Sequence, residues 1–247
     1  MQSGAHIHLA ASSVPITLAL AGISLLYLCG WRRRAIWRVA TFLAAVFAVW
    51  IAIASPLATL DHQLLTFHMV KHLVLMTVAA PLVLWGLPAR GSLRWSGRSL
   101  VLCWLAGTAT VIGWHIPAVF QLALGSQAWH SVENSSFLLA GLLFWWPVVQ
   151  SRPENTPPWS LPLYLFFATI PCDILSAFLA FCGRVVYPSY LTVPRHFVLS
   201  ALEDQEFAGA LMWVAVTLIY LIPAVMITVR VLSPRVPLNS QPEGVSA

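Results

Sequence analysis

The chain is dominated by long apolar runs that carry almost no charge. Of its 247 residues, 59% are hydrophobic and only 9% are charged, which is more apolar surface than one water-soluble core can bury. A bilayer core about 30 Å thick is crossed by about 20 apolar residues in a helix, and the runs here are of that order. The alternating apolar and polar pattern of barrel strands is absent. The sequence therefore predicts an all-α, polytopic transmembrane helical bundle.

The apolar runs predict about seven membrane spans. These runs lie at 13–31, 36–54, 66–88, 99–119, 132–150, 160–182 and 205–230. We expect residues 1–235 to form a single integral membrane domain and residues 236–247 to form a disordered cytoplasmic tail, because the tail is polar and lacks apolar periodicity.

Basic residues predict how the spans are oriented. Of the 13 lysines and arginines, only Lys71, Arg184 and Arg195 fall on one side of the predicted topology. Because short cytoplasmic loops retain Lys and Arg, this asymmetry indicates that the N-terminus is outside and the C-terminus inside, N-out/C-in. The same distribution accounts for the net charge of +5. It leaves no basic, aromatic-rich patch for nucleic acid, so the expected partner of this surface is the lipid bilayer.

The eight histidines map to one membrane face. Counting about 1.5 Å per helical residue from the cytoplasmic arginines puts His72 and His115 near the outer boundary. The remaining histidines fall in outer loops, in the outer N-terminal segment or at the outer ends of spans, at positions 6, 8, 62, 68, 130 and 196.

The sharpest local pattern is a stripe formed by His68, His72 and Met76. Residues four apart share one face of a helix, so the three side chains point in one direction. Two imidazoles and a thioether suit Cu(I), or Cu(II) with an open position. Alternatively, both histidines hydrogen-bond to neighbouring helices or interfacial water, and Met76 is a packing residue.

Two further histidines border helix ends. His115 comes two residues before Pro117, which ends the span, and it either completes a metal site or lies in an interfacial aromatic belt beside Trp114. His130 comes just before the fifth run. There Glu133 is also typical of a first helical turn, where the helix dipole favours an acid.

Polar residues in and near the last two spans are also candidates for a functional role. Asp204 and Gln205 belong to a polar tetrapeptide that opens the last run. Ordinary helix capping competes there with a metal-attracting or partner-docking role. Asp173 lies within a span, where an ionised carboxylate costs several kcal/mol unless it is paired or protonated. Lys71 is the intramembrane cation that we expect to pair with it.

The residues do not assemble a catalytic set. A nucleophile with its base, a phosphate-binding glycine loop and paired catalytic carboxylates are all missing, so we do not expect an enzyme. Three non-enzymatic readings remain: a copper-handling factor, a membrane cytochrome with haem between His72 and His115, and a transporter for copper or a small solute. A transporter needs polar groups that continue inward, but below the histidines the spans are almost wholly apolar.

Short motifs follow one another in order along residues 15–230. They are Ser55-Pro56-Leu57, His68-Met69-Val70-Lys71-His72 with Met76 and Pro81, Trp114-His115-Ile116-Pro117, His130-Ser131-Val132-Glu133, Phe144-Trp145-Trp146-Pro147, Tyr187-Pro188-Ser189-Tyr190 and Glu203-Asp204-Gln205-Glu206. In this order they resemble the CtaG family of caa(3)-type cytochrome c oxidase assembly factors, a family of seven-span membrane proteins.

The resemblance implies a role in respiratory chain biogenesis. Such a protein would supply or hold copper, at the outer face of the cell inner (cytoplasmic) membrane, for the buried copper centre of the oxidase catalytic subunit. Its implied partners are that subunit and other copper chaperones. The implied metal ligands are His68, His72, His115 and His130, with Glu133, Asp204 and Gln205 as polar motif members.

The sequence departs from the family pattern beside the candidate ligands. Lys71 stands where a neutral Gln is expected, and Asn134 stands where the family often has another His. A cation between His68 and His72 would repel a metal ion bound there.

Overall fold

The computed structural model describes residues 2–30, 35–88, 97–150, 157–192 and 199–233, with side chains from residue 14 onward. Its elements are α1 (Gln2–Cys29), α2 (Ile36–Ile53), the 3₁₀ turn η1 (Pro56–His62), α3 (Leu65–Leu73), the π-helical segment η2 (Val74–Ala79), α4 (Ala80–Gly86), α5 (Gly97–His115), α6 (Pro117–Gly125), α7 (Gln127–Gln150), α8 (Ser160–Phe181), the 3₁₀ turn η4 (Pro188–Leu191) and α9 (Ala201–Leu232). The described residues contain no strand, which confirms the all-α expectation for them. The predicted tail at 236–247 lies outside the described residues.

Five helical stretches are long and apolar enough to cross a membrane, and they make this a multi-pass membrane protein. They are α2, the continuous run from Leu65 to Gly86, α7, α8 and α9. A sixth is possible if α5 and α6 form one span, although they meet at an angle of 77°. In α1, the apolar stretch within the described residues is Val14–Cys29. Within the described parts of the chain, length and composition thus give five or six spans, where the sequence predicted seven.

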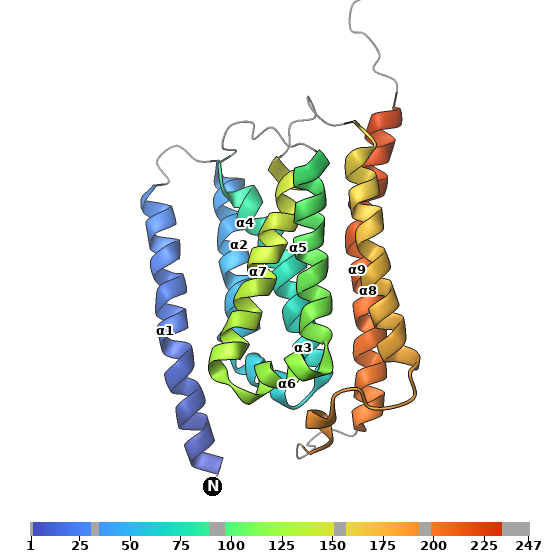
Figure 1. The fold of residues 1–247 in the computed structure, drawn as a ribbon. Helices are drawn as coiled ribbons and strands as arrows, with labels where there is room; N and C mark the ends of the chain where they lie inside the picture. The colour runs from blue at the N-terminus through green and yellow to red at the C-terminus, as the bar shows by residue number, and fades with distance from the viewer. Residues whose placement is uncertain (1, 31–34, 89–96, 151–156, 193–198, 234–247) are drawn as a thin grey trace, which may run out of the picture.

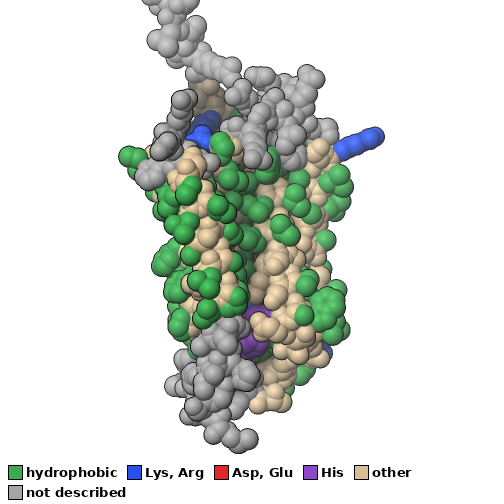
Figure 2. All heavy atoms as spheres, turned by 90° about the vertical axis from the view of Figure 1, so that its left-hand side faces the viewer, with side chains coloured by type: hydrophobic (Ala, Val, Ile, Leu, Met, Phe, Trp, Pro, Cys, Tyr) green, Lys and Arg blue, Asp and Glu red, His purple; other side chains and the backbone are tan. Residues whose placement is uncertain are grey.

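Large apolar side chains on the outside of the bundle indicate that lipid surrounds it. Leu26 is 77% exposed, Leu102 65% and Ile174 67%. Apolar side chains also cover the middle of the face in Figure 2. Exposed apolar surface on this scale is stable in lipid rather than in water.

At one end of the bundle, a ring stack and hydrogen bonds hold α1, α2 and α4 together. The ring of Tyr27 stacks on Phe42 with 3.8 Å between centroids, and its hydroxyl donates to the Gly86 carbonyl at 2.6 Å. Arg38 donates to the carbonyl of Leu87 at 2.9 Å. These bonds satisfy carbonyls that the end of α4 leaves without helical partners.

The π-helical segment η2 is held by close packing against α7. A Cβ added to Gly141 would lie 2.7 Å from the Met76 carbonyl oxygen, so a glycine is required at this contact. The indole of Trp145 donates to that same carbonyl at 3.1 Å. Short π-helical segments are frequent at functional sites, and this one begins two residues after His72.

The opposite end of the bundle contains a bend between α5 and α6 and a cap on α3 that comes from α9. Pro117 begins α6 after a break at Ile116, because a proline cannot continue the hydrogen bonding of the preceding helix. Figure 1 shows α6 lying across the end of the bundle beside α3. Asp204 of α9 accepts hydrogen bonds from the backbone N–H groups of Leu65 and Thr66 at 2.7 and 3.2 Å, which fixes the start of α3 against α9.

Candidate metal centre

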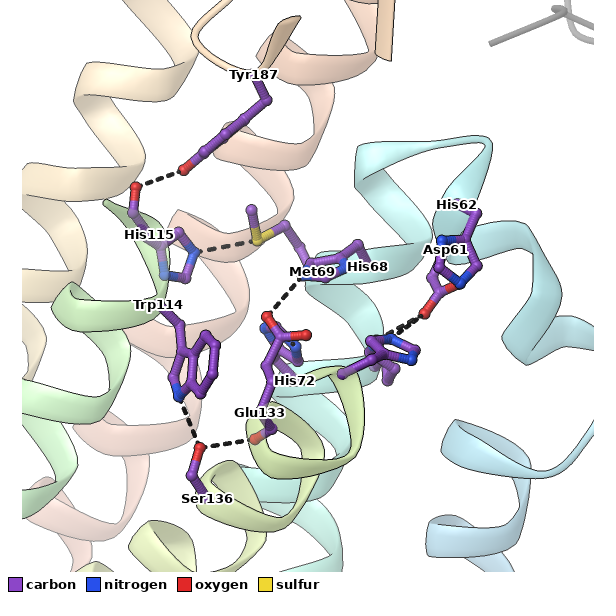
Figure 3. Close-up of polar contacts among 12 residues, drawn as sticks. Asp61, His62, His68, Met69, His72, Trp114, His115, Glu133, Ser136 and Tyr187 are labelled. Atoms are coloured by element: carbon purple, nitrogen blue, oxygen red, sulfur yellow. Dashed lines mark hydrogen bonds and ion pairs between the residues drawn. The ribbon is translucent and has the colours of Figure 1, made fainter. Parts of the chain in front are cut away.

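The histidines with described side chains gather at the end of the bundle where η1, α3, α6 and the start of α7 meet (Figures 1 and 3). They are His62, His68, His72, His115 and His130. The expected gathering at one end is confirmed for these five. His6 and His8 lie in the part of α1 whose side chains are not described, and His196 lies outside the described residues.

His68 and His72 of α3 converge with Glu133 of α7 (Figure 3). The Nε2 atoms of His68 and His72 lie 3.2 and 3.4 Å from Glu133 Oε1. The two imidazole rings meet edge to face with 4.4 Å between centroids. His68 and Glu133 are fully buried and His72 is 5% exposed. One ligand atom from each residue therefore falls within 4.8 Å of the others.

The spacing and the unused polar atoms of this His68–His72–Glu133 cluster fit a metal ion. Ligand atoms about 2.0–2.1 Å from one tetrahedral ion lie about 3.3–3.4 Å apart, close to the two observed separations. Both imidazole Nδ1 atoms, His72 Nε2 and Glu133 Oε2 are buried without a hydrogen-bond partner among the described residues. Each such atom costs about 1–3 kcal/mol, and a cation bound by the unprotonated ring nitrogens and the carboxylate would remove part of that cost.

Aromatic side chains fix the two imidazoles. Phe137 of α7 stacks on His72 with 3.8 Å between centroids, and Phe120 of α6 lies 4.7 Å from His68. The backbone of Glu133 is held in turn, because its carbonyl accepts from Ser136, whose hydroxyl accepts from the indole of Trp114 (Figure 3). These contacts hold the ligand atoms in place before any ion binds.

Lys71 turns away from the cluster and pairs with Asp61 of η1. Its ammonium donates to Asp61 Oδ2 at 2.6 Å and lies 2.6 Å from His130 Nε2. The predicted pair of Lys71 with Asp173 is therefore wrong: Asp173 accepts instead from the Thr217 hydroxyl at 3.1 Å. Asp61 is the nearer partner because η1 folds back over α3, and its charge offsets the repulsion that the sequence predicted between Lys71 and a bound cation.

His130 belongs to the Lys71–Asp61 group rather than to the cluster around Glu133. Its Nε2 lies 3.0 Å from Asp61 Oδ2. Asp61, His68 and His130 also bring ligand atoms within 4.8 Å of one another, but the ammonium of Lys71 already provides the cation that this acidic group requires. Sequence reasoning left Asp61 out of the site, although a buried lysine ten residues later calls for an acidic partner.

Charges around η1 determine the ionisation of Asp61. Burial alone would raise the pKa of its carboxyl, but the hydrogen bond with His130 and the positive charge of Lys71 lower the pKa well below its usual range. His62, 3.6 Å from Asp61 Oδ1, remains 44% exposed. Burial lowers the pKa of His62 against the opposing pull of Asp61, so this imidazole is mainly neutral near pH 7.

His115 and Met76 lie on the other side of the cluster. His115 Nε2 is 3.2 Å from the sulfur of Met69, and the His115 carbonyl accepts from the Tyr187 hydroxyl at 3.0 Å (Figure 3). Met76 lines the same small cavity as His72 and His115. Of the expected stripe, His72 and Met76 thus share this cavity, whereas His68 is not among its lining residues.

Asp204 and Gln205 hold helices and turns in place. Asp204 caps α3, as described above. The Gln205 carbonyl oxygen accepts from Val186 N at 2.7 Å, and its amide nitrogen donates to the Leu179 and Arg184 carbonyls at 3.2 and 3.0 Å. The capping expected at the start of the last run comes from Ser200 and Glu203, which form a reciprocal capping box for α9.

Comparison with known proteins identifies the family. The sequence model described as cytochrome c oxidase caa3 assembly factor (Caa3_CtaG) matches residues 25–233, a segment that contains all the residues of the candidate centre. No curated protein and no solved structure matches the chain. Because the matched segment covers most of the chain, this protein belongs to the CtaG family of cytochrome c oxidase assembly factors.

Proposed function

We propose that this protein is a non-enzymatic assembly factor that holds copper in the His68–His72–Glu133 cluster and passes it to cytochrome c oxidase. Copper is its cargo in this account, and the partners are the oxidase catalytic subunit and other copper chaperones. The observation that carries the proposal is the meeting of two imidazoles and one carboxylate inside a buried cluster, with unsatisfied atoms on all three residues.

The donor set supports copper over the hard cations. Imidazole suits Cu, Zn, Fe and Ni, whereas Mg²⁺ and Ca²⁺ prefer sites built from oxygen. Among divalent first-row metals, Cu²⁺ binds such N and O ligands most tightly. Two neutral imidazoles with one carboxylate also carry a single negative charge, which partly offsets the desolvation of a divalent ion.

The proposed orientation is N-out/C-in, with the cluster at the outer face of the inner (cytoplasmic) membrane. Figure 1 shows the start of α1 and the end of α9 at opposite ends of the bundle, which is consistent with termini on opposite sides of the membrane. Three of the described basic residues lie at the end of the bundle opposite the histidines, namely Arg38, Arg98 and Arg230. Lys71 and Arg184 lie at the histidine end. The excess of basic residues at the end of the bundle away from the cluster supports a cytoplasmic location for that end.

Neither alternative reading gains support from the geometry. A haem between His72 and His115 would need space for a macrocycle, but the cavity that they share is about 30 Å³. A transport pathway would need polar groups that continue from the cluster through the membrane. The described core beyond Met76 consists instead of apolar and aromatic side chains such as Leu84, Phe144 and Tyr164.

Copper binding by purified protein tests the proposal. We expect the wild type in detergent to bind Cu(II) and the Glu133→Gln and His68→Asn variants to lose at least about tenfold in affinity, measured by competition with a chromophoric chelator. His62→Gln is the matched control, because this exposed histidine is not part of the cluster. Equal copper affinity in the wild type and both cluster variants would contradict the proposal.

A further inference from the structure

Beside the His68–His72–Glu133 cluster, we propose a second metal site, a soft site for Cu(I) built on Met69 of α3 and His115 at the end of α5. It extends the proposed function by a separate site with a different ligand chemistry. It would remain if the first cluster bound no metal at all.

The hydrogen bonding of His115 leaves one ring nitrogen available as a ligand. Nδ1 lies 2.7 Å from the carbonyl oxygen of Val111, which can only accept, so Nδ1 carries the proton. A proton on Nε2 as well would make a charged imidazolium in a membrane-buried position, which is costly. Nε2 is therefore unprotonated. A histidine that donates one N–H to a backbone carbonyl is the usual arrangement of a metal ligand.

That free nitrogen faces the sulfur of Met69, which has no proton to give it. The two atoms are 3.2 Å apart (Figure 3), and a thioether sulfur is only a weak acceptor. Two lone pairs thus point at one another inside the protein. Met69 is 1% exposed, so water does not separate them. A soft cation accepted by both atoms would turn this unfavourable contact into two favourable ones.

Further soft donors surround the space next to this pair. A cavity of about 30 Å³ is lined by Met69 and His115 together with Met76, Met212 and Cys172. Met76 comes from the π-helical segment, Cys172 from α8 and Met212 from α9. A methionine side chain is unbranched and adapts easily, so these sulfurs can adjust around an ion. Of the four methionines whose side chains the structure describes, three line this cavity and Met226 lies elsewhere on α9.

The charge of the cavity favours a monovalent ion. None of its lining residues is an acid or a lysine or arginine, so an ion held there keeps its full charge. The Born cost of burying an ion rises with the square of its charge, so a divalent ion pays about four times the cost of a monovalent one. Thioether, thiol and imidazole donors with low charge select Cu(I). His72 lines this cavity and also contacts Glu133, so the two sites adjoin at that residue.

The experiment uses the full-length protein in detergent with Ag(I), a redox-inert probe for Cu(I), and with Cu(I) itself. X-ray absorption reports whether sulfur lies in the first coordination shell, and competition with a Cu(I)-specific chelator reports affinity. The test variants are Met69→Leu and Met212→Leu, which conserve volume. Met226→Leu is the matched control, because Met226 is 51% exposed on α9.

We expect sulfur and nitrogen around the bound ion in the wild type and in Met226→Leu. Met69→Leu should lose sulfur from the first shell and at least about tenfold in Cu(I) affinity, while its Cu(II) binding stays unchanged. Glu133→Gln should lose Cu(II) affinity while its Cu(I) binding stays unchanged, so failure of this site and failure of the first cluster are distinguishable. Only nitrogen and oxygen around the ion in the wild type, or unchanged Cu(I) binding in Met69→Leu, would overturn the proposal.

Discussion

At the scale of single residues, the Lys71–Asp61 pair lets a lysine lie between two candidate metal ligands. Lys71 is 4% exposed and Asp61 1%, so neither charge is stabilised by water. Their contact at 2.6 Å keeps the net charge of the pair at zero beside the His68–His72–Glu133 cluster. A cation approaching the cluster therefore meets a neutral pair.

Removal of either member of the pair should destabilise the protein. Lys71→Met leaves the carboxylate of Asp61 buried without its cation, which costs about 3–5 kcal/mol for a buried pair. The Lys71→Met/Asp61→Asn double variant should recover most of that loss, because neither buried charge then remains. Thermal unfolding in detergent measures both changes. Equal unfolding temperatures for the wild type and Lys71→Met would show that the pair carries no stability.

The stability that Asp61 contributes should depend on pH in one direction. Its pKa is lower in the folded protein than the ordinary value of 3.8, so its contribution is complete above that value and is lost as the pH falls below it. The unfolding temperature of the wild type should therefore approach that of Asp61→Asn as the pH is lowered from 4 toward 2. A difference between the two proteins that stays constant over this range would contradict the assignment.

At the scale of elements, the run from Leu65 to Gly86 presents the two histidine ligands. Asp204 fixes the start of this run, the π-helical segment η2 follows His72, and Gly141 lets α7 approach η2 closely. Glu133 lies on α7 about two turns before Gly141, and there it faces His68. The geometry of the cluster thus depends on the packing of α7 against η2.

A methyl group at position 141 should disturb that packing. In Gly141→Ala the new Cβ would meet the Met76 carbonyl oxygen at 2.7 Å and the Ala80 side chain at 2.9 Å, so the helices must separate. We expect a loss of about 1–3 kcal/mol in stability together with weaker copper binding. Gly113→Ala is the control, because a Cβ there meets nothing within 4 Å. Equal behaviour of the two variants would contradict this account of α7.

The elements also show what the sequence can predict. Apolar runs located the five helical stretches that are long enough to cross a membrane, and the spacing of His68 and His72 predicted their shared face. The contacts of Asp61 with Lys71 and of Asp204 with Leu65 could not be read from the chain, because they join segments through a 3₁₀ turn and across 139 residues. The pairing of Met69 with His115 was missed because methionine also serves as an ordinary core residue.

At the scale of the whole molecule, the proposed orientation puts the cluster outside and the end of α9 inside. Thr192 and Ser233 are exposed at the two ends. In a background without native cysteines, Thr192→Cys should react with a membrane-impermeant maleimide added to intact cells, and Ser233→Cys should react only after permeabilisation. The opposite labelling pattern would reverse the orientation and place the cluster on the cytoplasmic side.

The copper-to-haem ratio of oxidase purified from cells whose only copy of this protein carries Glu133→Gln tests whether His68, His72 and Glu133 hold copper destined for cytochrome c oxidase. We expect a lower copper-to-haem ratio than in cells with the wild type, at equal levels of the assembly factor, and recovery when copper is added to the medium. An unchanged ratio in copper-limited cells would contradict that expectation.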